Sequence, residues 1–138
     1  MSKTNYVPMT HDVLAFHKKY GIDYKGPVRP LPGDLQTFRN KRAFDEVQEI
    51  VDASTSGDLP MVLDGIIDTI YILLGTAHLH GFTPEQVNEA WRRVHAANMA
   101  KVRATTESPH GDLGIRNGDI VKPAGWTHPD LSDLCQNS

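Results

Sequence analysis

The stretch Pro60–Gly81, PMVLDGIIDTIYILLGTAHLHG, decides the fold. It is apolar on nearly all sides, with a proline suited to a first helical turn and a glycine suited to the position after the last one. We therefore expect a buried helix at roughly 60–80. Two acids, Asp64 and Asp68, interrupt the apolar residues and share one helix face because four residues separate them.

Caps and apolar periodicity predict three more helices around this one. Thr10 is placed to cap a first helix that ends at Gly21, and Asp34 to cap a second helix at roughly 34–55. The run Thr83-Pro84-Glu85-Gln86 has the capping-box pattern and opens a fourth helix, which we expect to reach about Arg103.

The remaining tail, 104–138, is rich in glycine and proline. Its run Arg116-Asn117-Gly118-Asp119 is typical of a hairpin turn, and we expect Ile120 and Val121 to form a short strand after it. The sequence thus predicts one all-α domain over 1–138, of the four-helix-bundle type. Its core helices cover about 10–103, and its C-terminal tail is irregular.

The amino-acid composition limits the classes of protein to which this chain can belong. The chain has 138 residues, 39% of them hydrophobic and 22% charged, with a net charge of −3, so we expect an ordinary globular protein without a nucleic-acid partner. Two acids near the middle of the most apolar stretch argue against a membrane span, and the N-terminus lacks the apolar region of a signal peptide. We expect a cytoplasmic protein, in the host cytoplasm if a phage encodes it.

Acidic side chains form the most informative pattern. The second helix carries Asp45, Glu46, Glu49 and Asp52 within about two turns. If this helix and the helix of Asp64 and Asp68 form an antiparallel hairpin, four or five carboxylates converge on one cleft, which suits Mg²⁺ or Mn²⁺. Two other interpretations stay open: a solvated acidic face, or salt bridges to Arg39, Lys41 or Arg42.

The end of the fourth helix places an amide and an ammonium group on one face, at Asn98 and Lys101. Such a pair suits a phosphate or a sugar, although a lysine near a helix C-terminus also compensates the helix dipole. Lys122 lies in the tail, which we expect to close over a ligand. Trp91, Trp126 and Tyr71 are candidates for stacking on a base, and packing is the alternative for each.

The ordered set of motifs resembles the MazG-like all-α NTP pyrophosphohydrolases over about residues 10–134. Asp45-Glu46-Val47-Gln48-Glu49 followed by Asp64-Gly65-Ile66-Ile67-Asp68 resembles their EExxE…ExxD signature, and Val94–Lys101 resembles their VHxSNMSK segment. The closing runs Asp119–Pro123 and Pro129–Leu131, and the first helix with Phe16-His17 and Tyr20-Gly21, are similar to phage and bacterial members. Two positions differ from the EExxE…ExxD signature. Asp45 replaces its first Glu, and Gly65 replaces the Glu three residues before the final Asp.

The resemblance implies a site and a reaction. Glu46, Glu49 and Asp68 correspond to the family's ligands of Mg²⁺, and Mn²⁺ would also serve in place of Mg²⁺. Asp64 would take the role of the missing Glu. Glu46 or Asp45 would orient or deprotonate the attacking water, and Lys101 would neutralise phosphate charge. Asn98, Lys101, Tyr71 and Lys122 are the expected substrate-binding residues. The implied reaction cleaves a nucleotide between its α- and β-phosphates, and the implied assembly is a homo-oligomer, a dimer of dimers.

The resemblance specifies the substrate less closely than the reaction. The likeness to phage-type members of the MazZ group makes dGTP the leading candidate, with phosphoribosyl-ATP, dUTP and dCTP as alternatives. The rival function is a non-catalytic helical module that binds a nucleotide or a regulatory partner.

Overall fold

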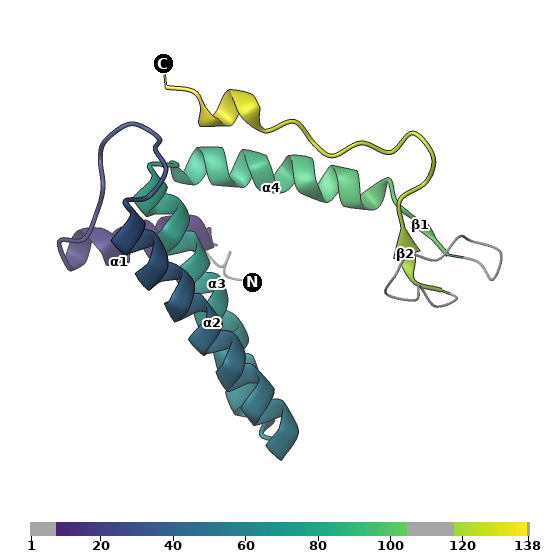
Figure 1. The fold of residues 1–138 in the computed structure, drawn as a ribbon, viewed down its shortest axis with the longest axis horizontal. Coiled ribbons are helices and arrows are strands. Elements are labelled where there is room, and N and C mark those ends of the chain that lie inside the picture. The colour runs from purple at the N-terminus through teal and green to yellow at the C-terminus, as the bar shows by residue number, and fades with distance from the viewer. Residues whose placement is uncertain (1–7, 105–117, 138) are drawn as a thin grey trace, which may run out of the picture. The chain divides into compact units, whose positions relative to one another are not determined.

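In the computed structural model, which describes residues 8–104 and 118–137, helices make up most of the chain (Figure 1). The four helices of these residues are α1 (Met9–Lys19), α2 (Gly33–Ser56), α3 (Leu59–His80) and α4 (Pro84–Met99). Two strands, β1 (Val102–Arg103) and β2 (Ile120–Val121), and a short 3₁₀ helix, Ser132–Cys135, follow. The predicted all-α class is confirmed.

Contacts divide the chain into two compact units. The first unit comprises Met1–Val87 with Cys135–Ser138, and the second comprises Asn88–Leu134. The first therefore holds α1, α2, α3 and the start of α4, and the second holds the rest of α4 and the two strands. The single domain expected over 1–138 stays a prediction.

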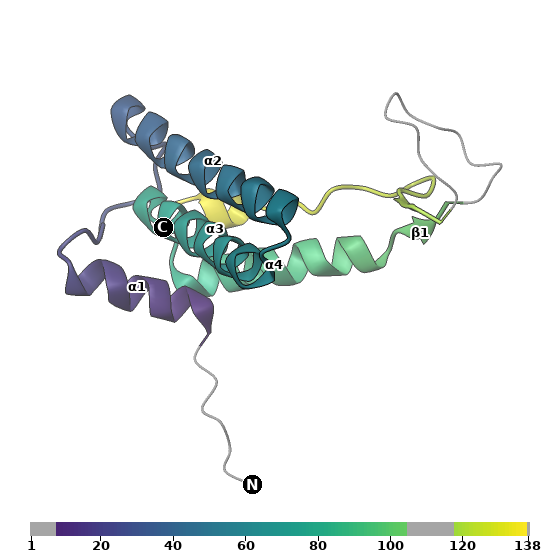
Figure 2. The ribbon, with the colours of Figure 1, turned by 90° about the horizontal axis from the view of Figure 1, so that it is seen from below.

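Helices α2 and α3 form the predicted antiparallel hairpin and lie side by side in both views (Figures 1 and 2). Gly57, at a φ of 74°, makes the turn between them, and the Asp58 carboxylate caps α3 by accepting from the Met61 N–H. Gly65 is buried against α2, where a Cβ would come within 2.7 Å of Ile50 Cγ1. The two backbones therefore approach closely at this point.

Two predicted caps are wrong in detail. Helix α1 begins at Met9, one residue before Thr10, and α2 begins at Gly33, one residue before Asp34; in both, a proline occupies the N-cap and no side chain caps the helix. A proline presets a backbone angle that can lead into a helix, so the start does not need an oxygen cap. Asp34 instead lies in the first turn, where its charge favours the helix dipole.

The capping box of α4 is confirmed, because the Thr83 N–H donates to Gln86 Oε1 and the Gln86 N–H donates to Thr83 Oγ1. The predicted end near Arg103 is wrong: α4 stops at Met99. Val102 and Arg103 pair antiparallel with Val121 and Ile120, so tertiary pairing overrides helix continuation. The strand at 120–121 is thereby confirmed, whereas Arg116 and Asn117 of the predicted turn lie outside the described residues.

Burial of α3 was overestimated. Only Gly65 and Gly75 of this helix are buried, and Leu59 and Leu63 are 74% and 62% exposed. Three helices of one chain do not surround a helix that is apolar on all sides, so much of its surface stays open. Among the described residues, α3 is also the one helix long and apolar enough to cross a membrane by length and composition.

Candidate active site

A cleft of about 440 Å³ opens in the first unit, between α1, α2 and α3. Its lining combines two acids, two arginines, a buried histidine and aromatic and aliphatic side chains: Phe16, His17, Ile22, Arg39, Arg42, Glu46, Asp68, Tyr71 and Ile72. The antiparallel hairpin brings Glu46 of α2 and Asp68 of α3 into this one cleft, as the sequence predicted.

Glu46 has the electrostatic signature of a ligand-binding carboxylate. Its Oε2 is buried and has no hydrogen-bond partner. Desolvation raises the pKa of Glu46 above its usual value, and the nearby charges of Glu49 and Asp68 raise it further, while Arg42 opposes them. The negative charges of Glu49 and Asp68 therefore act on a Glu46 carboxylate whose buried oxygen has no hydrogen-bond partner of ordinary geometry.

These acids fit the Mg²⁺ that the resemblance implies. A hard cation beside the unpartnered Glu46 oxygen would remove both the repulsion and the lost hydration. Within residues 8–104 and 118–137, however, no three His, Cys, Asp or Glu side chains are arranged as a ready group of metal ligands. Glu46, Glu49 and Asp68 are the residues that would hold the ion.

The other predicted acids are placed differently. Asp45 forms a salt bridge with Lys41 at 2.8 Å, as one alternative interpretation foresaw, and Asp52 accepts from Gln48 at 2.9 Å. Asp64 is exposed and does not line the cleft. Its proposed role as the substitute ligand stays a prediction, with no contact that favours it. Gly65, where the resemblance expects a Glu, faces Ile50 and has no room for a side chain.

Arginines supply the positive side of the cleft. Arg39 reaches across to α3, where Nη2 donates to the Ile72 carbonyl at 2.6 Å and Nε donates to Thr76 Oγ1 at 3.1 Å. Burial lowers its pKa, as does the charge of Arg42. The salt bridge considered for Arg39 from sequence is thus replaced by hydrogen bonds to α3. Arg42 lies near Glu46 and pairs with no carboxylate among the described residues.

The sequence pattern does not indicate that His17, Phe16 or Arg39 belongs to a site. His17 is 2% exposed, and Phe16 packs edge-on against Tyr71 with ring centroids 5.4 Å apart. Both come from α1, which lies far from the acids in sequence. The one available signal was the Phe16-His17 pair within the resemblance, which carried no role.

In the second unit, two lysine side chains lie over one tryptophan ring. Lys101 Nζ and Lys122 Nζ lie 5.2 Å and 4.9 Å from the centroid of the Trp126 ring, and Trp126 Nε1 donates to the Ala97 carbonyl. Neither lysine pairs with a carboxylate among the described residues. Two predicted substrate-binding lysines are thus brought together, while Asn98 is exposed at the end of α4. Trp91 is 75% exposed, so it is not packed in a core formed by the described residues.

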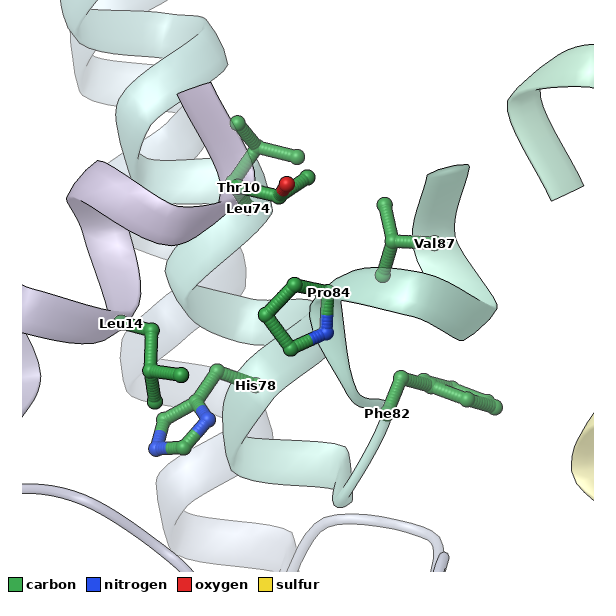
Figure 3. A pocket seen from close by; sticks show the side chains of 7 residues that line it. All are labelled: Thr10, Leu14, Leu74, His78, Phe82, Pro84 and Val87. Atoms are coloured by element: carbon green, nitrogen blue, oxygen red, sulfur yellow. The ribbon is translucent and has the colours of Figure 1, made fainter. Parts of the chain in front are cut away.

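A smaller hollow lies where α1, α3 and the start of α4 meet (Figure 3). The side chains that line it are mostly apolar, and His78 is a polar exception. The volume of the hollow is about 10 Å³. That volume holds about one water molecule, so this hollow cannot hold a nucleotide.

Most residues that line the cleft, including both acids, lie in a segment that matches a protein family. Residues 26–98, just over half of the chain, match the phosphoribosyl-ATP pyrophosphohydrolase family. Among curated proteins, no relative matches the chain. The match covers α2 and α3, which supply Glu46 and Asp68, and most of α4. The chain therefore belongs to the phosphoribosyl-ATP pyrophosphohydrolase family, part of the MazG-like all-α NTP pyrophosphohydrolase superfamily.

Proposed function

We propose that this protein hydrolyses a nucleoside triphosphate between its α- and β-phosphates, in a Mg²⁺-dependent reaction that releases the monophosphate and pyrophosphate. The family supports a nucleotide pyrophosphohydrolase in general. The observation that carries the metal-dependent form is the buried, unpartnered Oε2 of Glu46, with Glu49 and Asp68 beside it. A cation would offset the charge of these carboxylates, and a nucleoside triphosphate commonly brings Mg²⁺ with it.

The role that we propose for each residue follows from the charge of its side chain. Glu46, Glu49 and Asp68 would hold the ion, and a carboxylate of this set, Glu46 first, would orient the attacking water and take its proton. A Mg²⁺ ion supplies charge neutralisation for the phosphates and makes a water more acidic. Lys101 and Lys122 bind phosphate oxygens, and Asn98 binds the sugar or a phosphate. Asp45, held by Lys41, is the weaker candidate for the base.

For the substrate we propose dGTP, on the likeness of the whole chain to phage-type members. Phosphoribosyl-ATP is the competing substrate, because the matching family carries its name. The cleft offers Tyr71 and Phe16 as aromatic surfaces for a base, and both substrates carry a purine. The aromatic lining therefore does not separate the two.

The test is a direct assay of pyrophosphate release with Mg²⁺ across the eight common ribo- and deoxynucleoside triphosphates and phosphoribosyl-ATP. We expect turnover of dGTP above all others. Turnover of phosphoribosyl-ATP alone would overturn the substrate proposal and keep the reaction. Activity on none, together with nucleotide binding, would establish the non-catalytic module instead.

We further propose that the protein assembles as a dimer of dimers through α3. Its exposed apolar side chains are a surface that water does not favour: Leu59, Met61, Leu63, Ile66, Ile67, Ile70 and Leu73. A second copy of the same surface covers it symmetrically. Light scattering at micromolar concentration should report four copies of the 15.3 kDa chain, and a monomer would contradict this.

A further inference from the structure

Helices α2 and α3 touch closely at two points of the hairpin, and at each a side chain of α2 lies over a glycine of α3. A Cβ at Gly65 would come within 2.7 Å of Ile50 Cγ1, and a Cβ at Gly75 would come within 2.8 Å of Arg39 Nη2. Because glycine has no Cβ, the side chains of α2 can reach the backbone of α3 at both points. Along α2, Glu46 lies between the two contacts.

Helical spacing explains why these contacts lie on either side of the acids. Arg39 and Glu46 are seven residues apart, about two turns, and therefore share one face of α2. Asp68, Ile72 and Thr76 follow one another at intervals of four residues and share one face of α3. Since the helices run antiparallel, a contact of Arg39 with this face places Glu46 level with the turn that contains Asp68.

Arg39 makes its contact through hydrogen bonds. Its Nη2 donates to the Ile72 carbonyl at 2.6 Å, and its Nε donates to Thr76 Oγ1 at 3.1 Å. Thr76 Oγ1 also donates to the Ile72 carbonyl at 3.1 Å, so the two acceptors are held together. A planar guanidinium that donates from two of its nitrogens restricts both the distance and the angle of a contact. Arg39 therefore restricts how α2 can move along α3 or away from it.

The charges of the acids act against this contact. Burial raises the pKa of Glu46, and the charges of Glu49 and Asp68 raise it further. Without a cation, carboxylates on facing helices favour a wider separation of those helices. A cation needs the opposite, because its oxygen ligands must lie close together. A contact that keeps the two helices together therefore limits the movement that metal binding would have to reverse.

We propose that Arg39 is a positioning residue, which holds α2 against α3 so that the acids of the proposed metal site stay close enough to share one divalent cation. In this role Arg39 acts through the backbone of α3 and touches neither the ion nor the substrate. The inference rests on the proposed function, because it takes Glu46, Glu49 and Asp68 to be the metal ligands.

The charge of Arg39 by itself would have the opposite effect. A guanidinium in the cleft repels a cation, so removal of its charge should strengthen metal binding, whereas loss of a positioning contact should weaken it. The direction of the change therefore separates the two roles. Arg42 is the matched control, because it lines the same cleft and its charge acts on Glu46. Among the described residues, no hydrogen bond joins Arg42 to α3.

The test measures the binding of Mn²⁺ alone by calorimetric titration, well below the melting temperature of each variant. Arg39→Met keeps an unbranched side chain and removes the guanidinium, and Arg42→Met removes the same charge elsewhere in the cleft. Thr76→Val removes one acceptor of Arg39 at nearly constant shape and leaves the charge of Arg39 in place. Thr76→Ser keeps the hydroxyl.

We expect Arg39→Met to weaken Mn²⁺ binding about tenfold or more, as is typical when a group that orients metal ligands is lost. Arg42→Met should leave Mn²⁺ binding unchanged or strengthen it. Thr76→Val should weaken it by a smaller factor than Arg39→Met, and Thr76→Ser should bind Mn²⁺ as the wild type does. If Arg39→Met does not fold, Thr76→Val tests the same contact.

Unchanged or tighter Mn²⁺ binding in folded Arg39→Met would overturn the proposal, and a lower melting temperature alone would show that Arg39 only supports the fold. Equal weakening in Arg42→Met would also overturn it. Failure of the proposed function appears in the wild type, which would then bind no Mn²⁺ and release no pyrophosphate. Mn²⁺ binding by the wild type, together with an unaffected Arg39→Met variant, rejects the role of Arg39 alone.

Discussion

The two units of this chain carry opposite unpaired charge. In the first, carboxylates gather around a buried oxygen of Glu46 that has no partner. In the second, Lys101 and Lys122 share the ring of Trp126 without a carboxylate among the described residues. Other charged side chains form ion pairs among the described residues: Arg93 bonds to Glu89 and Asp133, and Lys41 bonds to Asp45. The acids proposed to hold a metal ion thus lie in the first unit, and the two lysines proposed to bind phosphate lie in the second.

The largest expected effect comes from the acidic side. Glu49→Gln and Asp68→Asn should abolish turnover, a loss of at least about a thousandfold, because each removes the charge of a metal ligand at nearly constant shape. The metal-free variants should melt at or above the wild-type temperature, since repulsion falls. Steady-state kinetics and thermal unfolding measure both. Asp52→Asn is the control, because Asp52 pairs with Gln48 away from the cleft. A wild-type rate in either variant would place the ligands elsewhere.

Substitution of Lys101 should lower activity less than substitution of the acids. Lys101→Ala should lower kcat/KM by roughly 10–1000-fold, a loss of about 1.4–4 kcal/mol of transition-state stabilisation. The melting temperature should hardly change, because a surface lysine adds little to stability. Lys19→Ala is a matched control: this lysine also lies over an aromatic ring, that of Tyr20 at 5.3 Å, in the first unit. A large drop in melting temperature with normal kinetics would make Lys101 a structural residue.

The smallest effect concerns the pH dependence of stability. Burial lowers the pKa of His17 and of His78 below the usual 6.5, so the unfolded chain binds protons more readily than the folded one. Stability is then present above pH 6.5 and is lost as the pH falls through that value toward the folded pKa. We expect the melting temperature to fall by roughly 2–6 °C between pH 7 and 5.

His17→Phe should flatten that slope, and Lys19→Ala should leave it unchanged. The difference between variant and wild type isolates His17, because the raised pKa of Glu46 acts in the opposite direction: its contribution is lost as the pH rises. An identical slope in His17→Phe would mean that this histidine takes up its proton without cost in the folded state.

Much of the fold could be predicted because its signals are local. The Thr83–Gln86 capping box, the glycines after α2 and α3, and the apolar run of α3 all act within a few residues. Errors arose where distant residues decide. Val102 pairs with Val121 and so leaves the helix, and the exposure of α3 depends on what surrounds it.

The site was predictable to the same extent. Helical spacing and the hairpin placed Glu46, Glu49 and Asp68 near one another. Spacing left open whether Lys41 pairs with an acid, and it did not show that Gly65 lies against Ile50. His17 enters the cleft because α1 packs on α3 beside Gly75, a contact between residues 58 positions apart that no local pattern encodes.

The most direct test of the central claim is the dependence of turnover on a divalent cation. Pyrophosphate release from the preferred nucleotide should stop in excess EDTA and return with Mg²⁺ or Mn²⁺, because the proposed ligands are carboxylate oxygens without Cys or His. In parallel, Mg²⁺ with an α,β-methylene analogue of that nucleotide should raise the melting temperature of the wild type and not that of Asp68→Asn. Full turnover in excess EDTA would contradict the account.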